Sequence, residues 1–109
     1  MELESSKTDI QGLLETRNMQ GLKTLLEEWL PQELALLCED LNEDDQVQLF
    51  KAIDRDRAFA TFENLEINVQ KSLVDALPNR LVSLILNDMS ADNRTALLEE
   101  LKPEQLNKL

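Results

Sequence analysis

The chain has 109 residues, 42% of them apolar, and it carries a net charge of −11 with no histidine and no tyrosine. The length suits a single domain, and so strong a negative charge excludes partners that are themselves polyanions, namely nucleic acid and an anionic membrane surface. The lack of histidine, together with the single cysteine, Cys38, excludes a His- or Cys-based transition-metal site and a Cys–His catalytic pair. The polar, acidic N-terminus shows no secretory signal. We therefore expect a cytosolic protein that is not an enzyme and inserts no segment into a bilayer.

Nine short helices are predicted in chain order. Their expected ranges are 7–16, 19–29, 31–40, 43–52, 55–64, 67–76, 78–88, 91–100 and 103–109. The breaks between them are indicated by prolines, which the first turn of a helix tolerates, and by good N-cap residues. These residues are Pro31, Asn42, Asp54, Pro78, Ser90 and Pro103. Helices of about ten residues are marginal alone, so tertiary packing must hold them.

Three columns of apolar residues recur every twelve positions along the chain. The anchors of the first column are Trp29, Leu41, Ile53, Leu65, Leu77, Met89 and Leu101. The residue three before each anchor and, apart from Thr61, the residue four before it are also apolar. Offsets of three and four share one helix face, but twelve residues of continuous helix would rotate that face by about 120°. The period therefore predicts one short helix per unit, stacked as an all-α helical-repeat solenoid over residues 1–109.

Carboxylates are the candidate metal ligands, and they fall in three runs. The runs are Glu39, Asp40, Glu43, Asp44 and Asp45; Asp88 and Asp92; and Glu99, Glu100 and Glu104. Such side chains suit a hard cation such as Mg²⁺, but acids in the first turn of a helix also interact favourably with its dipole. Both interpretations stay open for each run. The alternating residues 54–57, Asp-Arg-Asp-Arg, predict a solvated cluster of ion pairs.

The segment from Asp9 to Leu41 carries the residues that point to a family. A short helix and a polar turn precede a unit of the form P-x-[DE]-[LI]-A-x-L-x-x-x-L. The residues of this unit are Pro31, Glu33, Leu34, Ala35, Leu37 and Leu41. The segment resembles the opening of the cytosolic N-terminal domain of MgtE-type magnesium transporters, and the following twelve-residue units are similar to the rest of that domain.

The resemblance implies a right-handed superhelix of short helices, related to armadillo and flagellar motor-switch folds, that regulates a transporter. In that family, Mg²⁺ bound between this domain and a pair of CBS domains closes the pore when cytosolic magnesium is high. The implied partners are the CBS and transmembrane domains of the parent transporter, at the cytoplasmic face of the inner or plasma membrane. Two facing acidic surfaces repel each other unless cations bridge them, which gives this mechanism a physical basis.

One metal-ligand position of the family is matched in this chain. The family's S-x-D-D turn corresponds to residues 90–93, so the resemblance implies that Asp92 contacts Mg²⁺. The second acid of that turn is Asn93 here, the acid one turn beyond the first is Ala96, and the acid of the central helix is Ala60. The resemblance therefore implies a partial Mg²⁺ site that needs ligands from a partner domain.

An alternative function is a stand-alone protein-interaction scaffold, such as a flagellar-switch-like adaptor, whose concave face binds a partner segment. Residues 103–109 bear on the extent of the domain. They open another unit, in which Leu109 returns to the column four before the anchor, but no anchor follows. We therefore expect the chain to be cut within the repeat array, ahead of CBS and transmembrane domains.

Overall fold

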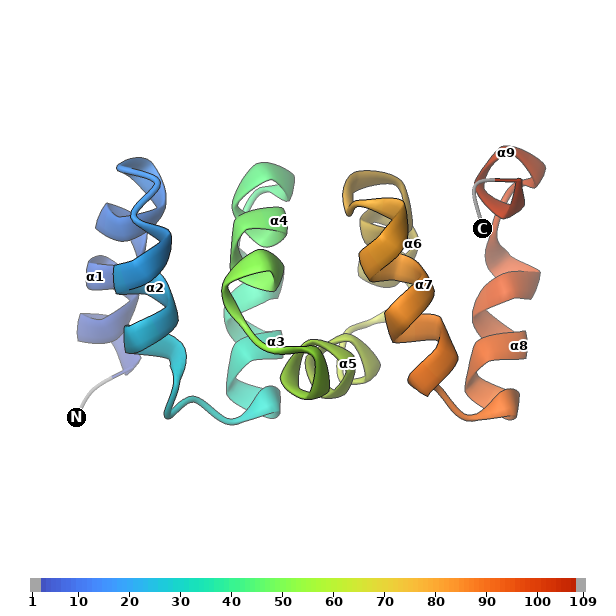
Figure 1. The fold of residues 1–109 in the computed structure, drawn as a ribbon, viewed down its shortest axis with the longest axis horizontal. Coiled ribbons are helices and arrows are strands. Elements are labelled where there is room, and N and C mark those ends of the chain that lie inside the picture. The colour runs from blue at the N-terminus through green and yellow to red at the C-terminus, as the bar shows by residue number, and fades with distance from the viewer. Residues whose placement is uncertain (1–2, 108–109) are drawn as a thin grey trace.

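The computed structural model describes residues 3–107 and confirms the all-α fold, with nine helices and no strand in this part of the chain. The helices are α1 (Leu3–Glu15), α2 (Met19–Leu26), α3 (Pro31–Asp40), α4 (Glu43–Ala52), α5 (Arg55–Glu63), α6 (Ile67–Ala76), α7 (Asn79–Asp88), α8 (Ala91–Glu100) and α9 (Pro103–Leu106). They follow one another along the longest dimension of a body that measures 40 × 23 × 20 Å (Figure 1). Among the described residues, no helix combines the length and the apolar character that crossing a bilayer requires.

The starts of the helices are evenly spaced over most of the chain. The first residues of α3 to α9 are 31, 43, 55, 67, 79, 91 and 103, so each of these helices begins twelve residues after the one before it. The predicted bounds of α3, α4, α6 and α8 match the structure, and α5 ends one residue earlier than predicted. The N-cap side chains of Asn42, Asp54 and Ser90 each accept a hydrogen bond from the backbone N–H three residues on, as good N-cap residues do.

The predicted ends of the other helices need correction. α2 ends at Leu26 rather than at residue 29, because the chain must leave the helix before Leu30, whose backbone is extended (φ −77°, ψ 152°) ahead of Pro31. α1 begins at Leu3 rather than at residue 7, since neither proline nor glycine interrupts residues 3–11. Pro78 precedes α7 as its N-cap instead of starting it. α9 is a single turn, and Leu109 lies outside the described residues.

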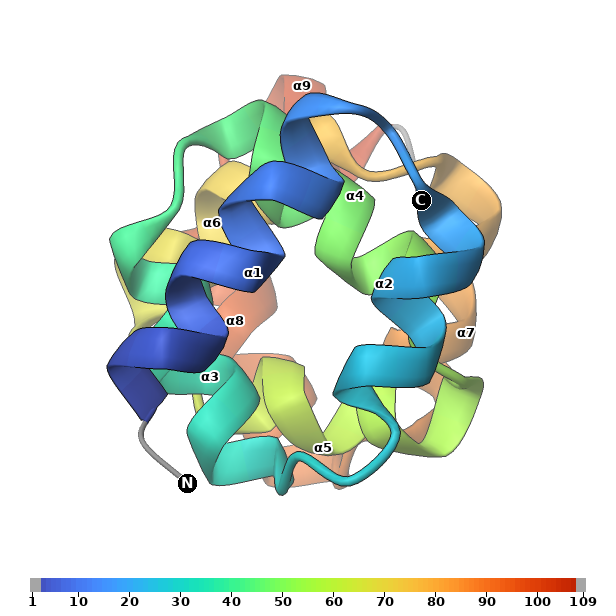
Figure 2. The same cartoon turned by 90° about the vertical axis from the view of Figure 1, so that its left-hand side faces the viewer.

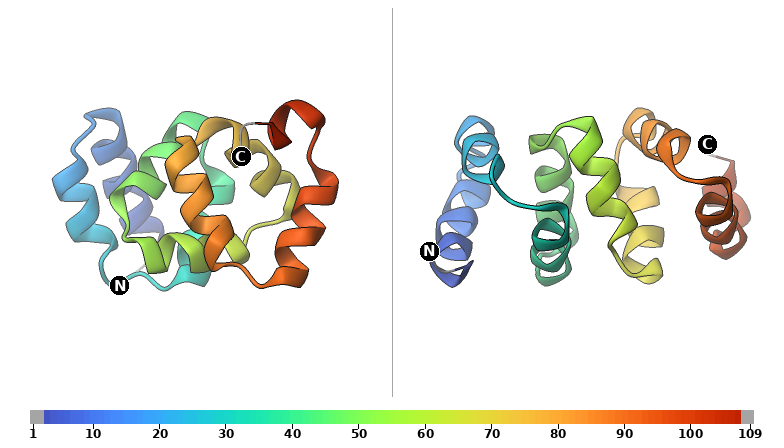
Figure 3. Two further views of the ribbon diagram at one scale, coloured as in Figure 1. Left: turned by 45° about the vertical axis from the view of Figure 1, so that its right-hand side comes forward. Right: turned by 90° about the horizontal axis from the view of Figure 1, so that it is seen from below.

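The helices from α2 to α8 pack chiefly against the helix two places along the chain. The pairs are α2 with α4, α4 with α6, α6 with α8, α3 with α5, and α5 with α7, while α1 packs on α2. Figure 3 shows this succession from two further directions, and Figure 2 shows the helices surrounding a common axis when the array is seen end on. The helices therefore form a solenoid, in which each is held by neighbours that do not adjoin it in sequence.

The anchor residues lie just after the helices, as the predicted ranges place all of them except Trp29, which was expected within the helix that ends at Leu26. Five are C-cap residues with extended backbone, and the other two follow the C-caps of α2 and α5 within two residues. All seven side chains are nevertheless buried, with at most 8% exposed. In Leu41 and Leu65, for example, the backbone N–H donates to the carbonyl three residues earlier, at 3.1 Å. The backbone of each anchor residue thus changes the direction of the chain, while the side chain of the same residue stays in the core.

Hydrogen bonds from polar side chains join successive helices in pairs. Gln46 Nε2 donates to the Cys38 carbonyl at 2.8 Å, and Gln70 Nε2 donates to the Phe62 carbonyl at 2.7 Å. Arg94 makes the corresponding contact with the carbonyl eight residues before it, at 3.3 Å. Each donor is the fourth residue of α4, α6 or α8, and each acceptor lies near the end of the preceding helix. Each of these carbonyls also accepts the backbone N–H three residues on, so the side chain adds a second hydrogen bond to it and fixes α3 to α4, α5 to α6 or α7 to α8.

Thr61, the one polar member of the columns, is wholly buried, and its Oγ1 atom has no hydrogen-bond partner among the described residues. A buried hydroxyl without a partner has lost its hydrogen bonds to water and has gained none within the protein, which lowers stability. We predict that Thr61→Val, which keeps the shape and removes the hydroxyl, raises the free energy of unfolding by about 1 kcal/mol. Urea denaturation followed by circular dichroism measures this change.

Thr95→Val is the matched control for this prediction, because Thr95 is exposed on α8. Its free energy of unfolding should change by less than about 0.5 kcal/mol. Equal effects of the two substitutions, or destabilisation by Thr61→Val, would show that the buried hydroxyl is not a weak point of the core.

Candidate functional site

The start of α8 presents the predicted metal ligand to solvent. Ser90 caps the helix, and its Oγ accepts the backbone N–H of Asn93 at 3.3 Å. Asp92, the second residue of the helix, is exposed. A carboxylate at this position interacts favourably with the positive end of the helix dipole whether or not it also binds a cation. Asp92 is therefore available to an ion or to a partner surface.

Two of the three residues at the other acid positions that the resemblance implies, Asn93 and Ala96 but not Ala60, line a small hollow between α5, α6 and α8. Its volume is about 160 Å³, and its lining residues are Glu63, Ile67, Gln70, Met89, Asn93 and Ala96. The Asn93 amide donates to Glu63 Oε2 at 3.3 Å. Asp92 is not among the lining residues, so the structure brings Asn93 and Ala96 together but leaves Asp92 apart from them.

Glu63 is a carboxylate at this hollow that the sequence analysis missed. It stands three residues after Ala60, about one helical turn along α5. That spacing from a position where the family has an acid is the signal that would have indicated it. The neutral amide of Asn93 donates a hydrogen bond to the carboxylate of Glu63. An acid at position 93 would instead repel Glu63.

The predicted runs of carboxylates do not gather into a metal site. In the part of the chain that the structure describes, no group of three or more Asp, Glu, Cys or His side chains is arranged to hold an ion. The run at 43–45 occupies the first turn of α4, where it interacts with the helix dipole, and Glu43 Oε2 accepts a hydrogen bond from Ser72 Oγ at 2.6 Å. Glu100 lies 3.9 Å from the ammonium of Lys71.

Asp88 is engaged by an arginine from another helix. Arg55 donates through Nε and a terminal nitrogen to the two carboxylate oxygens of Asp88, at 3.0 and 2.9 Å. This hydrogen bond, with the attraction between the charges, raises the pKa of Arg55. The prediction of a local ion-pair cluster at residues 54–57 is thus wrong: Arg55 reaches from α5 to α7, because bidentate pairing with a carboxylate is a stronger contact than the flexible pairing of sequence neighbours.

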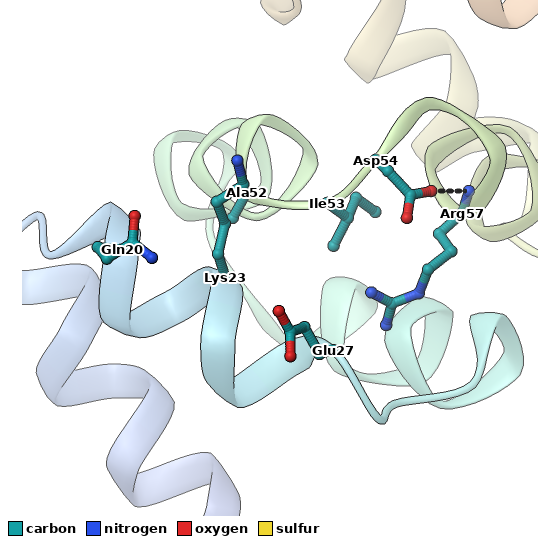
Figure 4. A pocket seen from close by; sticks show the side chains of 7 residues that line it. All are labelled: Gln20, Lys23, Glu27, Ala52, Ile53, Asp54 and Arg57. Atoms are coloured by element: carbon teal, nitrogen blue, oxygen red, sulfur yellow. Dashed lines mark hydrogen bonds between the residues drawn. The ribbon is translucent and has the colours of Figure 1, made fainter.

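Arg57 has a different role, and Figure 4 shows it among the residues that line a cavity. Its backbone N–H donates to Asp54 Oδ1 at 2.9 Å, while its guanidinium donates to the carbonyl of Leu26 and, at 2.6 Å, to that of Trp29. It lines a cavity of about 280 Å³ together with Gln20, Lys23, Glu27, Ala52, Ile53 and Asp54. Arg57 therefore caps the C-terminal end of α2 and joins the first helices to the rest of the array.

Cys38 is buried in the core of α3. Burial, with a smaller contribution from the charge of Glu39, raises the pKa of its thiol to about 12. Since the thiolate is the nucleophile and the metal ligand, a cysteine with this pKa is inert near neutral pH. Its burial agrees with its place in the apolar column three residues before the anchor Leu41.

The cysteine can be tested by its reactivity. At about pH 8 the native chain should react with a maleimide at a negligible rate, because only about one thiol in 10,000 is ionised four units below its pKa. Labelling should be complete in denaturing urea, as mass spectrometry would show. Rapid labelling of the native chain would place the thiol at the surface instead.

The contacts of Arg57 predict that its substitution lowers the stability of the fold. Arg57→Gln should lower the free energy of unfolding by about 2 kcal/mol, because it removes charge-assisted hydrogen bonds to the carbonyls of Leu26 and Trp29, of which the Leu26 carbonyl keeps only the bond from the Trp29 N–H. The loss should persist at high salt, since the contact is partly buried. Urea denaturation at low and high NaCl measures both properties.

Arg55→Gln is the matched control for Arg57→Gln. It removes an ion pair whose arginine is 51% exposed, so its effect should be much smaller and should fade as salt is added. If Arg57→Gln were no more destabilising than Arg55→Gln, the guanidinium would not hold α2 in place.

Comparison with models of known families finds one that matches most of the chain. The model of the MgtE intracellular N domain matches residues 29–109. The match begins at the first anchor, so it takes in α3 to α9 and leaves out α1 and α2, although the resemblance in sequence starts at residue 9. None of the curated proteins compared with the chain matches it. With three quarters of its length matched, the chain belongs to the MgtE intracellular N domain family.

Proposed function

We propose that this chain is the regulatory, non-enzymatic domain of a magnesium transporter, at the cytoplasmic side of the membrane, and that it senses intracellular Mg²⁺ at an interface with CBS domains. The observation that carries the proposal is the family match over residues 29–109. The MgtE N domain is a part of a transporter and has no catalysis of its own to perform. The same match favours this function over the flagellar-switch-like scaffold.

The charge of the chain supports a cation-dependent interface. With 22 acidic and 11 basic residues, the surface repels another acidic surface at low ionic strength. A divalent cation between the two converts that repulsion into attraction. Association with an acidic partner would then follow the concentration of Mg²⁺, which is the behaviour that a sensor needs.

The residues present fit a shared Mg²⁺ site better than a site complete within the chain. Mg²⁺ keeps several water ligands and binds through one or two protein carboxylates. Exposed Asp92 can supply one such carboxylate, whereas Glu63 is already hydrogen-bonded to Asn93 and the described residues contain no cluster of three ligands. Asp92 would thus hold the ion from one side, and the remaining ligands would come from water and the partner.

This arrangement makes a two-part prediction. Millimolar MgCl2 should leave the melting temperature of the isolated chain nearly unchanged, because a single exposed carboxylate binds Mg²⁺ weakly. With the CBS-domain pair of the parent transporter, MgCl2 should produce a complex that EDTA dissolves. Calorimetric melting measures the first effect, and analytical ultracentrifugation measures the second.

Two substitutions test the role of Asp92 in that complex. Asp92→Asn should weaken the Mg²⁺-dependent association about tenfold or more, which corresponds to about 1.4 kcal/mol. Asp56→Asn is the matched control, because Asp56 is exposed and stands at the same second position of α5. If MgCl2 produced no association, the proposed function would fail. If the two substitutions acted equally, Asp92 would have no special part in it.

A further inference from the structure

An open groove lies between the end of α4 and the start of α7, away from the start of α8. Its volume is about 310 Å³, and its lining residues are Phe50, Lys51, Ile53, Pro78, Arg80, Leu81 and Leu84. Five of these residues are apolar, and the surface open to solvent within the groove is almost wholly apolar. A hollowed apolar surface with a polar rim is typical of a binding site for another molecule.

The two charged residues of the groove are both cations, on a chain that has twice as many acids as bases. Lys51 and Arg80 are exposed, and neither has an ion-pair partner among the described residues. Three other cations of the array do have partners, namely Arg55 with Asp88, Lys71 with Glu100, and Arg57 with backbone carbonyls, whereas exposed Lys23 and Lys102 stand outside this groove. The groove therefore combines uncovered apolar surface with uncompensated positive charge.

We propose that this groove binds a polypeptide segment that inserts one or two bulky apolar side chains and carries acidic residues beside them. The volume is at the lower end of the range for ligand pockets, about 300–1,000 Å³, which suits side chains. The acids of the segment would lie against Lys51 and Arg80, where charge complementarity gives specificity and faster association.

Charge also decides between this occupant and two others. A net charge of −11 repels an anionic membrane surface as a whole, so two cations at one groove favour a short acidic segment over a lipid bilayer. It equally opposes contact between two copies of the chain. The groove contains no carboxylate and needs no Mg²⁺, so this inference does not depend on the proposed function.

The experiment selects ligands without assuming a sequence. A randomised dodecapeptide display library is enriched on the full chain, and enriched peptides are synthesised and measured by fluorescence anisotropy. We expect them to combine acidic residues with Leu, Ile, Phe or Trp. Raising NaCl from about 50 to about 500 mM should weaken their binding, because exposed charges are screened.

Charge-reversal variants locate the binding site. Lys51→Glu with Arg80→Glu should weaken the enriched peptides at least about tenfold, and the milder Lys51→Gln with Arg80→Gln should weaken them less. Lys23→Glu with Lys102→Glu is the matched control, since it shifts the net charge of −11 by the same amount at exposed positions outside the groove. It should leave affinity within about twofold. Circular dichroism melting verifies that every variant is folded.

Several results would overturn the inference. They are the absence of enrichment, enriched peptides that lack acidic residues, and equal weakening by the groove and control variants. Binding to phosphatidylserine vesicles that the groove variant abolishes would assign the groove to a lipid surface. A dimer that the groove variant disrupts would assign it to a second copy of the chain.

Discussion

Burial of the anchor side chains at the helix ends is the constraint on which this structure depends. The core helices have only eight to ten residues, so their own hydrogen bonds do not stabilise them in water. At the ends of α3, α4, α6, α7 and α8 the backbone becomes extended while an apolar side chain remains in the core, as at Leu41 and Leu77. One residue thus ends a helix, turns the chain and contributes to the packing of the helices that follow.

Polar contacts then determine how the turns are fixed. Gln46 and Gln70 donate second hydrogen bonds to carbonyls near the ends of α3 and α5, and Arg57 does the same at the end of α2 from a more distant helix. Because each bond joins one helix to the end of another, these side chains restrict the angle between the helices. The repeating structural unit is therefore a pair of helices, although the apolar columns recur with every helix.

Because the apolar columns are buried in the core, the residues that carry the function must lie on the surface. That surface is acidic overall, which suits the proposed regulation by a divalent cation at an interface, and Asp92 is the exposed carboxylate that we propose as a ligand. The basic groove at Lys51 and Arg80 is a second, chemically different surface on the same array. Asp92 and the groove lie on different helices, so the two proposals concern separate surfaces.

The sequence alone determined the fold class, the places where most helices begin and the residues that fill the core. These follow from local chemistry: apolar spacing identifies buried faces, and proline, Asn42, Asp54 and Ser90 mark helix starts. Only the tertiary structure decided which helices pair, that Arg55 reaches Asp88 across 33 residues, and that Asn93 meets Glu63 rather than joining Asp92 at a metal site. A long side chain can reach several possible partners. Which of them it contacts depends on how helices that are distant in sequence pack together, and no local sequence pattern encodes this packing.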